Sequence, residues 1–375
     1  MRVLVVSGIW PPDVGGPASH APDVASFLLE RGHDVEVVVT ADAPPAPEAY
    51  PVRWISRSLP AGVRHVRALA AIAAGARRSD VVYATGMFAR SAAAAALTRT
   101  PLVLKLTGDP AFERLRWRGS FTGSLEDFQR AAGGPSVRVL RALRVVTLRG
   151  AARIVCPSAF LRELVVGWGV PATRVAVLPN PLPLVATPPD RAAARRRLGF
   201  DSDVVLAFAG RFGPQKALGV AVDAVASTEG VTLALAGEGA AEGELRRRAE
   251  PLAERVRFLG PLPRADVLDL FAAADASVLP SAWENLPHAV LESLAVATPV
   301  LATAVGGVPE LVQDGVNGLV VPPHDPAAFR DAVARFAHDP ELRARLRAGA
   351  AQSLDRFAPE RVYGELESIL LSVAR

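Results

Sequence analysis

Two cations in the second half of the chain are spaced so that both can bind one anion. In GRFGPQK, Arg211 and Lys216 follow an apolar run that ends beside Gly210. In a parallel sheet, the loop at this end of a strand opens toward the ligand-binding cleft, so both side chains can reach the same group. A diphosphate is an anion of suitable size. The spacing predicts a diphosphate site, with an unremarkable pair of surface charges as the alternative.

Two carboxylates, Glu284 and Glu292, lie on either side of a proline in WENLPHAVLES. On an unbroken helix they would diverge by roughly 80° and rise about 12 Å. Pro287 favours the first helical turn and disfavours helix at Leu286, so we expect Glu284 in a loop and Glu292 inside the helix. The helix N-terminus would then bind a phosphate, and the carboxylates would accept hydrogen bonds from sugar and ribose hydroxyls. The alternative is two solvated helix glutamates.

The basic residues are unusual in type and in distribution. Only two of 42 are lysines, Lys105 and Lys216, which suggests that each occupies a position needing a compact ammonium, although chance would also explain two survivors. Residues 53–153 contain 18 basic and 5 acidic residues, hence +13 of charge in a chain of net +4. This excess predicts an anionic partner, and we favour a membrane surface over nucleic acid, with a functionless Arg-rich surface as the alternative. Four aromatic residues interspersed among these arginines would suit such an interface: Trp54, Phe112, Trp117 and Phe121.

Composition limits the class of protein. The 375 residues are 50% hydrophobic and 21% charged, which excludes a mainly disordered chain and favours two domains. No apolar run reaches the roughly 18 residues of a membrane span, and MRVLVVSGIWPP lacks the pattern of a signal peptide, so we expect a cytoplasmic protein. The single cysteine, Cys156, cannot form an internal disulfide and is expected to pack as a small hydrophobe.

Short apolar runs alternate with helical stretches in two series, which is typical of parallel sheets covered by helices. We expect an α/β protein with two doubly wound, Rossmann-like domains on either side of a cleft. The expected parts are an N-terminal domain (1–178), a proline-rich linker (179–189), a C-terminal domain (190–357) and a C-terminal helix (358–375) that packs back on the N-terminal domain. The expected strands are 3–6, 35–40, 80–84, 102–106, 154–156, 204–209, 231–236, 256–258, 276–279, 300–302 and 319–321.

The whole chain resembles the retaining nucleotide-sugar transferases of glycosyltransferase family 4, which have the two-domain GT-B fold. The motifs that carry the resemblance are E-x7-E at 284–292, GRFGPQK at 210–216, AGEG at 236–239, FLG at 258–260, GGVPELVQDGVNGLVVPP at 306–323, and PPDVGG with RGHDV near the start. Several ordered motifs at matching separations are far more specific than any one of them.

This resemblance implies that residues 1–178 form the acceptor-side domain and residues 190–357 the donor domain, and it implies a role for each motif residue. Arg211 and Lys216 would hold the donor diphosphate, Glu284 the transferred sugar, Glu292 the ribose, and the main chain near Phe258 the base. Gly15 and Gly16 would let backbone N–H groups approach the diphosphate. The remaining expected donor contacts are Gly237, Asn285, Leu286 and Pro287.

The chain departs from the family pattern in LVLKLTGD, where many relatives have a histidine near the reacting sugar and this chain has Thr107. Asp109 is the substitute candidate for contacting donor sugar or acceptor, and capping of the segment that starts at Pro110 is the alternative. We expect no metal and no cofactor, because Asp201-Ser202-Asp203 precedes a strand and so lies at the opposite edge of the sheet.

The expected function is metal-independent transfer of a sugar from a nucleoside diphosphate sugar to a hydroxyl of a glycan or a lipid-linked acceptor, with peripheral attachment to the inner face of the membrane as an added expectation. Two alternatives remain open. The first is an epimerase or phosphorylase of the same fold, which turns over without an acceptor. The second is a regulatory protein that binds nucleotide sugars without turnover.

Overall fold

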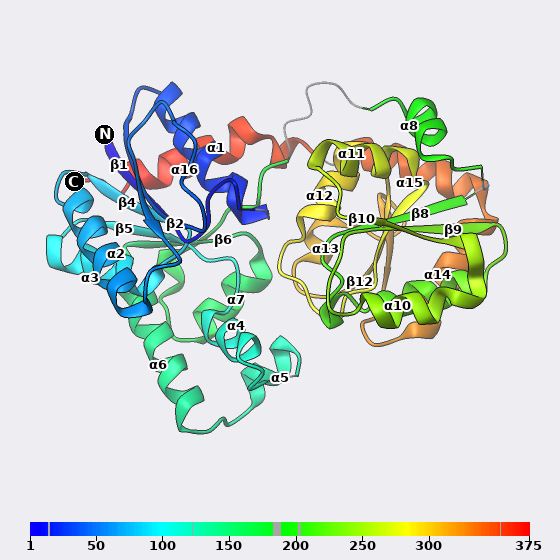
Figure 1. Ribbon diagram of the computed structural model, residues 1–375, viewed down its shortest axis with the longest axis horizontal. Coiled ribbons are helices and arrows are strands. Elements are labelled where there is room, and N and C mark those ends of the chain that lie inside the picture. The colour runs from blue at the N-terminus through cyan, green and yellow to red at the C-terminus, as the bar shows by residue number, and fades with distance from the viewer. Residues whose placement is uncertain (14–15, 122, 183–188, 202–203, 353) are drawn as a thin grey trace. The chain divides into compact units, whose positions relative to one another are not determined.

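The computed structural model describes residues 1–13, 16–121, 123–182, 189–201, 204–352 and 354–375, without the side chains of residues 16–19, 117, 253 and 351. The chain forms two compact units (Figure 1). Unit 1 comprises Met1–Pro179 together with Glu360–Arg375, and unit 2 comprises Asn180–Pro359. These boundaries fall close to the predicted ones. Most of the predicted linker, residues 183–188, lies outside the described residues.

Seven parallel strands form the sheet of unit 1, in the order β3-β2-β1-β4-β5-β6-β7. They are β1 (Arg2–Ser7), β2 (Asp34–Ala41), β3 (Val52–Ser56), β4 (Val81–Ala84), β5 (Leu102–Lys105), β6 (Arg153–Cys156) and β7 (Val175–Val177). The strands β1, β4 and β5 are buried almost throughout, because helices cover both faces of a parallel sheet. The sequence prediction missed β3 and β7, which are the two edge strands and are partly exposed.

Helices cover both faces of this sheet. On one face, α1 (Gly16–Glu30) and α16 (Pro359–Leu371) share a core with β1 and β2. The other face is covered by α2 (Ala61–Ala76), α3 (Phe88–Thr98), α6 (Pro135–Arg149) and α7 (Ala159–Gly167). Between β5 and β6 the chain also forms α4 (Pro110–Trp117) and α5 (Leu125–Arg130), and a short 3-10 helix, η1 (Ala172–Arg174), precedes β7.

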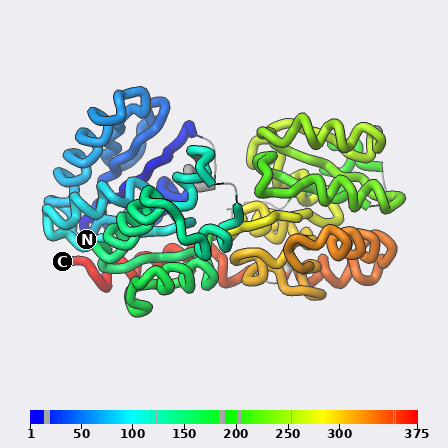
Figure 2. Tube along the Cα trace, turned by 90° about the horizontal axis from the view of Figure 1, so that it is seen from below, coloured from blue at the N-terminus to red at the C-terminus, as the bar shows by residue number. Residues whose placement is uncertain are grey.

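The last helix returns to unit 1. Val362, Leu366 and Leu370 lie on one face of α16 and are buried in the core that contains α1. Figure 2 shows the red C-terminal end of the chain within this unit. The apolar residues at helical spacing in 362–373 therefore cover the sheet of unit 1, as the sequence predicted.

Six parallel strands form the sheet of unit 2, in the order β10-β9-β8-β11-β12-β13. They are β8 (Val204–Ala209), β9 (Val231–Ala236), β10 (Val256–Gly260), β11 (Ala276–Leu279), β12 (Val300–Thr303) and β13 (Gly318–Val321). All six were predicted. The strands β8, β9, β11 and β12 are short, nearly continuous apolar runs and are buried almost throughout, which is the signature of a strand covered on both faces, whereas the edge strand β10 is only partly buried.

The helices of unit 2 also form two layers. The core on one face includes residues of α9 (Leu218–Ala226), α10 (Glu242–Ala249), α12 (His288–Ala295), α13 (Val308–Leu311), α14 (Pro326–His338) and α15 (Pro340–Gln352). The other core includes residues of α8 (Arg191–Leu198) and α11 (Arg264–Ala273). Three 3-10 helices complete the unit: η2 (Pro214–Lys216), η3 (Glu250–Arg255) and η4 (Asp355–Phe357).

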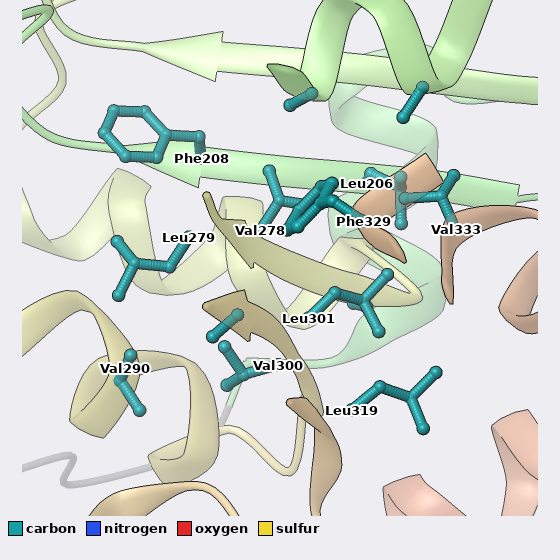
Figure 3. Packing of buried hydrophobic residues seen from close by; sticks show 14 of the residues in the cluster. Leu206, Phe208, Val278, Leu279, Val290, Val300, Leu301, Leu319, Phe329 and Val333 are labelled. Atoms are coloured by element: carbon teal, nitrogen blue, oxygen red, sulfur yellow. The ribbon is translucent and has the colours of Figure 1, made fainter. Parts of the chain in front are cut away.

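Packing in the centre of unit 2 fixes the strands that bear the predicted site. Leu206 of β8, Val278 of β11 and Leu301 of β12 are buried in one cluster with Phe329 and Val333 of α14 (Figure 3). Since protein cores are close-packed, the ends of β8 and β11 are held rigidly next to each other.

Within the described residues, no helix combines the length and the apolar composition that a membrane span requires.

Candidate active site

The loops after β8 and β9 touch each other through their main chains. A Cβ atom at Gly237, which has a φ of +134°, would lie 1.9 Å from the carbonyl oxygen of Gly210. Phe212 lies in the loop after β8, and its N–H donates to the carbonyl of Glu238 in the loop after β9 at 2.8 Å. Gly239 is equally confined, because a Cβ there would lie 2.4 Å from the Phe212 carbonyl oxygen. The glycines of AGEG therefore fix the path of the loop that carries Arg211 and Lys216.

The predicted cation and the predicted sugar-binding carboxylate are direct partners. Lys216, at the end of η2, places Nζ 2.5 Å from Oε1 of Glu284, and Ser281 Oγ donates to the same oxygen at 2.7 Å. Glu284 is only 5% exposed. Both hydrogen bonds go to Oε1, and Oε2 of Glu284 has no hydrogen-bond partner within the described residues. A carboxylate oxygen is thus left to accept a ligand hydroxyl.

Main-chain hydrogen bonds join the loops after β8 and β11 beside this ion pair. Ala282 N–H donates to the Gln215 carbonyl at 2.8 Å, and Gln215 Nε2 donates to the Trp283 carbonyl at 3.1 Å. Arg211 is exposed on the same loop, and its side chain makes no hydrogen bond or ion pair with any residue that the structure describes. The loop after β8 thus carries an exposed guanidinium, Arg211, and an ammonium, Lys216, that pairs with Glu284 in the loop after β11.

The turn at Glu284 is also supported from the next strand. Gly306, with a φ of +55°, lies so close that a Cβ would be 1.7 Å from the Glu284 carbonyl oxygen, and Gly307 N–H donates to the Asn285 carbonyl at 2.7 Å. Thr303 Oγ1 donates to the Ser281 carbonyl at 2.6 Å. The first residues of GGVPEL therefore act as a platform for the Glu284 turn, a role that the sequence prediction did not assign.

The helix after this turn begins where the sequence predicted. Pro287 occupies the N-cap of α12, and His288 is its first residue. Glu284 consequently lies in the loop and Glu292 inside the helix, as expected from the proline. Leu286 is buried, and its carbonyl accepts a hydrogen bond from Asn180 Nδ2 at 3.5 Å. This contact holds the main chain between the two glutamates.

Glu292 has its own cationic partner on a neighbouring helix. Nε of Arg264, at the start of α11, lies 3.5 Å from Oε1 of Glu292. Burial raises the pKa of Glu292, and Arg264 partly opposes this rise. A half-exposed arginine beside a largely buried carboxylate is a weak ion pair, so Glu292 retains capacity to accept ribose hydroxyls. Nothing in the sequence indicated Arg264, because it lies in a separate helix.

Phe258 lies near the carboxyl end of the edge strand β10. Its ring packs edge-on against Phe212, with centroids 6.3 Å apart, and the guanidinium of Arg246 lies 4.4 Å from its centroid. A register shift between Phe258 and Gly260 makes a bulge in β10, an edge strand, which takes the main chain of Leu259 out of the ladder. An irregular main chain at the end of an edge strand beside Phe258 suits recognition of a base edge.

These loops share one edge of the sheet of unit 2. They follow the carboxyl ends of β8, β9, β10, β11 and β12, where open α/β sheets bind their ligands. Among the described residues, no group of three or more His, Cys, Asp and Glu side chains is placed to hold a metal ion. Asp201 precedes β8 and thus lies at the opposite edge, and residues 202–203 of the same triplet lie outside the described residues.

The candidates in the first half of the chain have different outcomes. Gly15 lies outside the described residues, and Gly16 is the first residue of α1 in unit 1. Thr107, at the position of the family histidine, is exposed between β5 and α4. Lys105 is fully buried on β5, and burial lowers its pKa to about 7. The rarity of lysine did indicate an unusual position, although not its burial.

Of the two roles left open for Asp109, the structure shows capping. Its Oδ1 accepts from Ala111 N–H at 2.9 Å, and its Oδ2 accepts from Gln129 Nε2 at 3.0 Å and pairs with Arg144. Asp109 is 1% exposed. Both oxygens are therefore used to join α4, α5 and α6. A contact between Asp109 and a sugar would require breaking these bonds, so the prediction of a catalytic part for Asp109 is wrong and its role is structural.

The aromatic residues expected at an interface differ in exposure, since Phe112 is buried, Phe121 is partly exposed and Trp54 is exposed. Phe112 is buried, and it packs with Phe121 and Phe128 in a cluster with centroids 5.3 to 6.0 Å apart. Trp54 is 37% exposed on the edge strand β3, and its Nε1 donates to the Ala41 carbonyl. The side chain of Trp117 is outside the described residues. The prediction that Phe112 would lie on the surface is wrong, because alternation with arginines on α4 alone does not show which face is covered.

Comparison with known proteins identifies the two halves of the chain separately. A family model described as "Glycosyl transferases group 1" matches residues 190–353, and one described as "Glycosyl transferase 4-like domain" matches residues 15–181. The D-inositol 3-phosphate glycosyltransferase of Thermobispora bispora is 30% identical over 92% of this chain and 87% of its own. That of Geodermatophilus obscurus is 32% identical over 96% of this chain and 86% of its own.

Solved structures agree on the fold. Anabaena HepE in complex with UDP superposes with a TM-score of 0.80 at 22% identity, covering 99% of this chain and 100% of HepE. WaaG, a glycosyltransferase involved in lipopolysaccharide biosynthesis, gives a TM-score of 0.73 at 18% identity over 98% of this chain and 99% of its own. The predicted architecture and the predicted family are both confirmed. The chain belongs to the group 1 glycosyl transferases and is a glycosyltransferase with the GT-B fold.

Proposed function

We propose that the enzyme transfers the sugar of a nucleoside diphosphate sugar to a hydroxyl group of a glycan or lipid-linked acceptor, with retention of configuration at the anomeric carbon. The observation that carries the proposal is the Lys216–Glu284 pair, with Arg211 on the same loop as Lys216, at the carboxyl edge of the sheet. A sugar diphosphate needs cations at the phosphates and an acceptor of hydroxyl hydrogen bonds next to them. This edge supplies both within two adjacent loops.

The cations stabilise charge that develops on the leaving diphosphate. An ammonium has three N–H donors, so Lys216 can bind a phosphate oxygen while it keeps its hydrogen bond to Glu284. Arg211 offers a planar fork for a second pair of oxygens. The N-terminus of α12 adds the positive end of its dipole. Fixed cations of this kind lower the barrier because they require no reorganisation during the reaction.

The carboxylates position the two polyols of the donor. Glu284 accepts hydroxyls of the transferred sugar through Oε2, and Glu292 accepts hydroxyls of the ribose. During transfer, the bond between the anomeric carbon and the diphosphate oxygen breaks while the acceptor oxygen forms a bond on the same face. The acceptor proton passes to the departing phosphate oxygen. The sugar passes through an oxocarbenium-like state, which a neighbouring carboxylate stabilises.

The nucleotide and the acceptor are proposed from the comparisons. HepE is solved with UDP and with UDP-glucose, which supports a uridine nucleotide here. The curated relatives are named for an inositol phosphate acceptor, which supports an acceptor that bears phosphate.

A panel of UDP-, GDP- and ADP-sugars tests the function. We expect one UDP-sugar to raise the unfolding temperature and to be hydrolysed slowly, and we expect Arg211→Gln to lose both effects. Release of a rearranged or phosphorylated sugar without acceptor would favour an epimerase or a phosphorylase. Tight binding with no turnover under any condition would favour a regulatory protein.

We also propose that unit 1 binds an anionic membrane surface. Several arginines on α2 and α6, Arg67 and Arg138 among them, are exposed next to apolar side chains. The exposed apolar residues of this helical layer are Val63, Val66, Leu97, Val139, Leu143 and Val146. Apolar side chains among arginines can enter the headgroup region while the guanidiniums bind lipid phosphates.

Vesicle sedimentation tests this attachment. The protein should pellet with anionic vesicles and not with neutral ones, and salt should release it, since each arginine near the surface contributes about 1 kcal/mol. Val66→Glu should reduce the pelleted fraction several-fold. The matched control is Val316→Glu, because Val316 is 47% exposed in unit 2. Equal partitioning to both vesicle types, or an equal effect of both variants, would contradict the proposal.

A further inference from the structure

Unit 1 contains a pocket of about 270 Å³, lined by residues of α3, α4 and α6 and of the segments that lead into α3 and α4. Met87 and Phe88 line it at the start of α3, and Pro110 and Ala111 line it at the start of α4. These helices follow β4 and β5 directly, so the pocket lies at the carboxyl ends of those strands. That is the edge where open α/β sheets bind ligands. The exposed Thr107 lies at the same edge.

The lining of the pocket is apolar and cationic. Leu140 and Leu143 of α6 form one wall, and Arg90, Arg114 and Arg144 also line the pocket, whereas no Asp or Glu side chain is among the described lining residues. The charge of Arg144 is balanced, because it pairs with Asp109 and stacks 3.7 Å from the ring centroid of Trp168. The other two cations of the lining are Arg90 and Arg114.

Arg90 and Arg114 have no carboxylate partner among the described residues. Arg90 donates through Nη1 to His65 Nδ1 at 2.5 Å, while its buried Nε has no hydrogen-bond partner there. Burial lowers the pKa of Arg90, and the nearby Arg64 and Arg114 lower it further. The partly buried Arg90 is thus repelled by the exposed Arg114 when the pocket is empty. An anion bridging them would remove this repulsion and satisfy the unpaired N–H groups.

An apolar track leads from the pocket along the outside of α6. Val139, Leu143 and Val146 are 65%, 46% and 69% exposed and lie at helical spacing, so they share one face. Leu143 belongs both to this face and to the pocket wall. Scattered exposed apolar residues are normal, but a continuous row whose middle residue lines a cationic pocket matches a ligand with a hydrocarbon part and an anionic part.

We propose that this pocket binds the acceptor and that the acceptor is an amphiphile, with a phosphate held by Arg90 and Arg114 and a hydrocarbon chain lying over Phe88, Leu140 and Leu143. The inference rests on the proposed function, because it names the acceptor class of that reaction. A phosphorylated polyol without a chain would leave the apolar wall uncovered. A neutral lipid would leave the two guanidiniums unpaired. The charge and the apolar surface together select the phosphorylated lipid.

Calorimetric titration of the full chain with farnesyl phosphate tests the pocket without requiring turnover. We expect binding to the wild type, and at least tenfold weaker binding to Arg90→Gln, Arg114→Gln and Leu143→Glu, the last of which places a carboxylate beside the arginines. Arg138→Gln is the matched control, since Arg138 is exposed on α6, the helix of Leu143, and does not line the pocket. Arg114 is also exposed, so its replacement is not expected to disturb folding.

Three further ligands separate the sources of affinity. Farnesol tests the hydrocarbon part alone, inorganic phosphate tests the anion alone, and inositol phosphate tests a phosphorylated polyol. We expect each of them to bind at least tenfold more weakly than farnesyl phosphate. Equal binding of any of them, or pocket variants that bind like the control, would overturn the inference. Titration with UDP keeps it distinct from the proposed function. If UDP binds normally and farnesyl phosphate does not bind, only the inference about the pocket is wrong. If no nucleotide sugar binds or is turned over, the proposed function itself is wrong.

Discussion

Lys216 carries the largest share of the proposed chemistry, since it contacts Glu284 and can reach the diphosphate. We predict that Lys216→Ala lowers turnover about 100- to 1000-fold, the range expected when one group that stabilises transition-state charge is lost. Lys216→Arg should not restore activity, because a planar fork cannot replace a compact ammonium at 2.5 Å from Glu284. Steady-state donor hydrolysis measures both effects. Wild-type turnover in Lys216→Ala would exclude this role.

The two glutamates should respond differently to the same substitution. Glu284→Gln is expected to lower turnover with little change in UDP affinity, because it contacts the reacting sugar and Lys216. Glu292→Gln should weaken UDP binding about tenfold, the effect of losing a hydrogen bond to a charged group. Calorimetry with UDP and donor hydrolysis separate the two. Identical UDP affinities in both variants and the wild type would show that Glu292 does not bind the ribose.

Lys105 makes the stability of unit 1 depend on pH. Burial lowers its pKa to about 7, against an ordinary value of 10.5, with Cys156 weakly opposing. Above pH 7 the folded state is neutral at this position while the unfolded chain stays protonated, so stability rises by about 1.4 kcal/mol per pH unit until about pH 10. Below pH 7 both states bind the proton, and this contribution is constant.

Lys105→Met removes that dependence. The variant should be more stable than the wild type at pH 7, and its advantage should shrink as the pH rises toward 10. Urea unfolding at pH 7 and pH 9 measures the difference in midpoint, with the exposed Arg67→Met as the control. A parallel pH dependence in wild type and Lys105→Met would mean that the amine is not buried in the folded protein.

At the scale of elements, Asp109 shows how an N-cap becomes a tertiary contact. It caps α4 and pairs with Arg144 of α6 inside the protein. We predict that Asp109→Ala destabilises unit 1 by about 3 to 5 kcal/mol, since Arg144 is left as an unpaired buried charge. Asp325→Ala, which removes an exposed N-cap of α14, should cost only about 1 kcal/mol. Equal shifts in the urea midpoint for both would show that the Arg144 pair contributes nothing.

The sequence predicted elements well where one local signal determined them. Residues 204–209 and 231–236 are buried runs of parallel strand, and their predicted bounds match β8 and β9. Pro287 likewise located the start of α12. The edge strand β3 was missed because its exposed face gives it the mixed polarity of a loop. A three-residue strand such as β7 is stabilised by its neighbour and carries no pattern of its own.

The site could be predicted only in part, for a similar reason. Glu284, Glu292, Arg211 and Lys216 are close to strand or helix ends that the sequence reveals. The partners of these residues could not be predicted, because contacts such as that of Arg264 with Glu292 join separate elements and depend on packing. Ser281 was detectable, since it stands three residues before Glu284, the spacing of a local side-chain hydrogen bond.

At the scale of the whole molecule, each unit carries a distinct task. Unit 2 has cations and carboxylates at the carboxyl edge of its sheet, which suits a nucleotide sugar. Unit 1 has the pocket with Arg90 and Arg114 at the corresponding edge of its own sheet, which suits an acceptor. The excess of positive charge in residues 53–153 was visible in the sequence. Which arginines lack a carboxylate partner became visible only in the fold, since Arg144 and Arg90 look alike in the sequence.

The most direct test of the central claim is the configuration of the product formed from an α-linked UDP-sugar, chosen as the one that most raises the unfolding temperature. Methanol serves as the acceptor, because the resulting methyl glycoside cannot change its anomeric configuration afterwards. Proton NMR of the mixture should show the methyl α-glycoside and equimolar UDP with the wild type, and neither with Lys216→Ala. A methyl β-glycoside would contradict retention, and the absence of UDP release from every nucleotide sugar would contradict the proposed reaction.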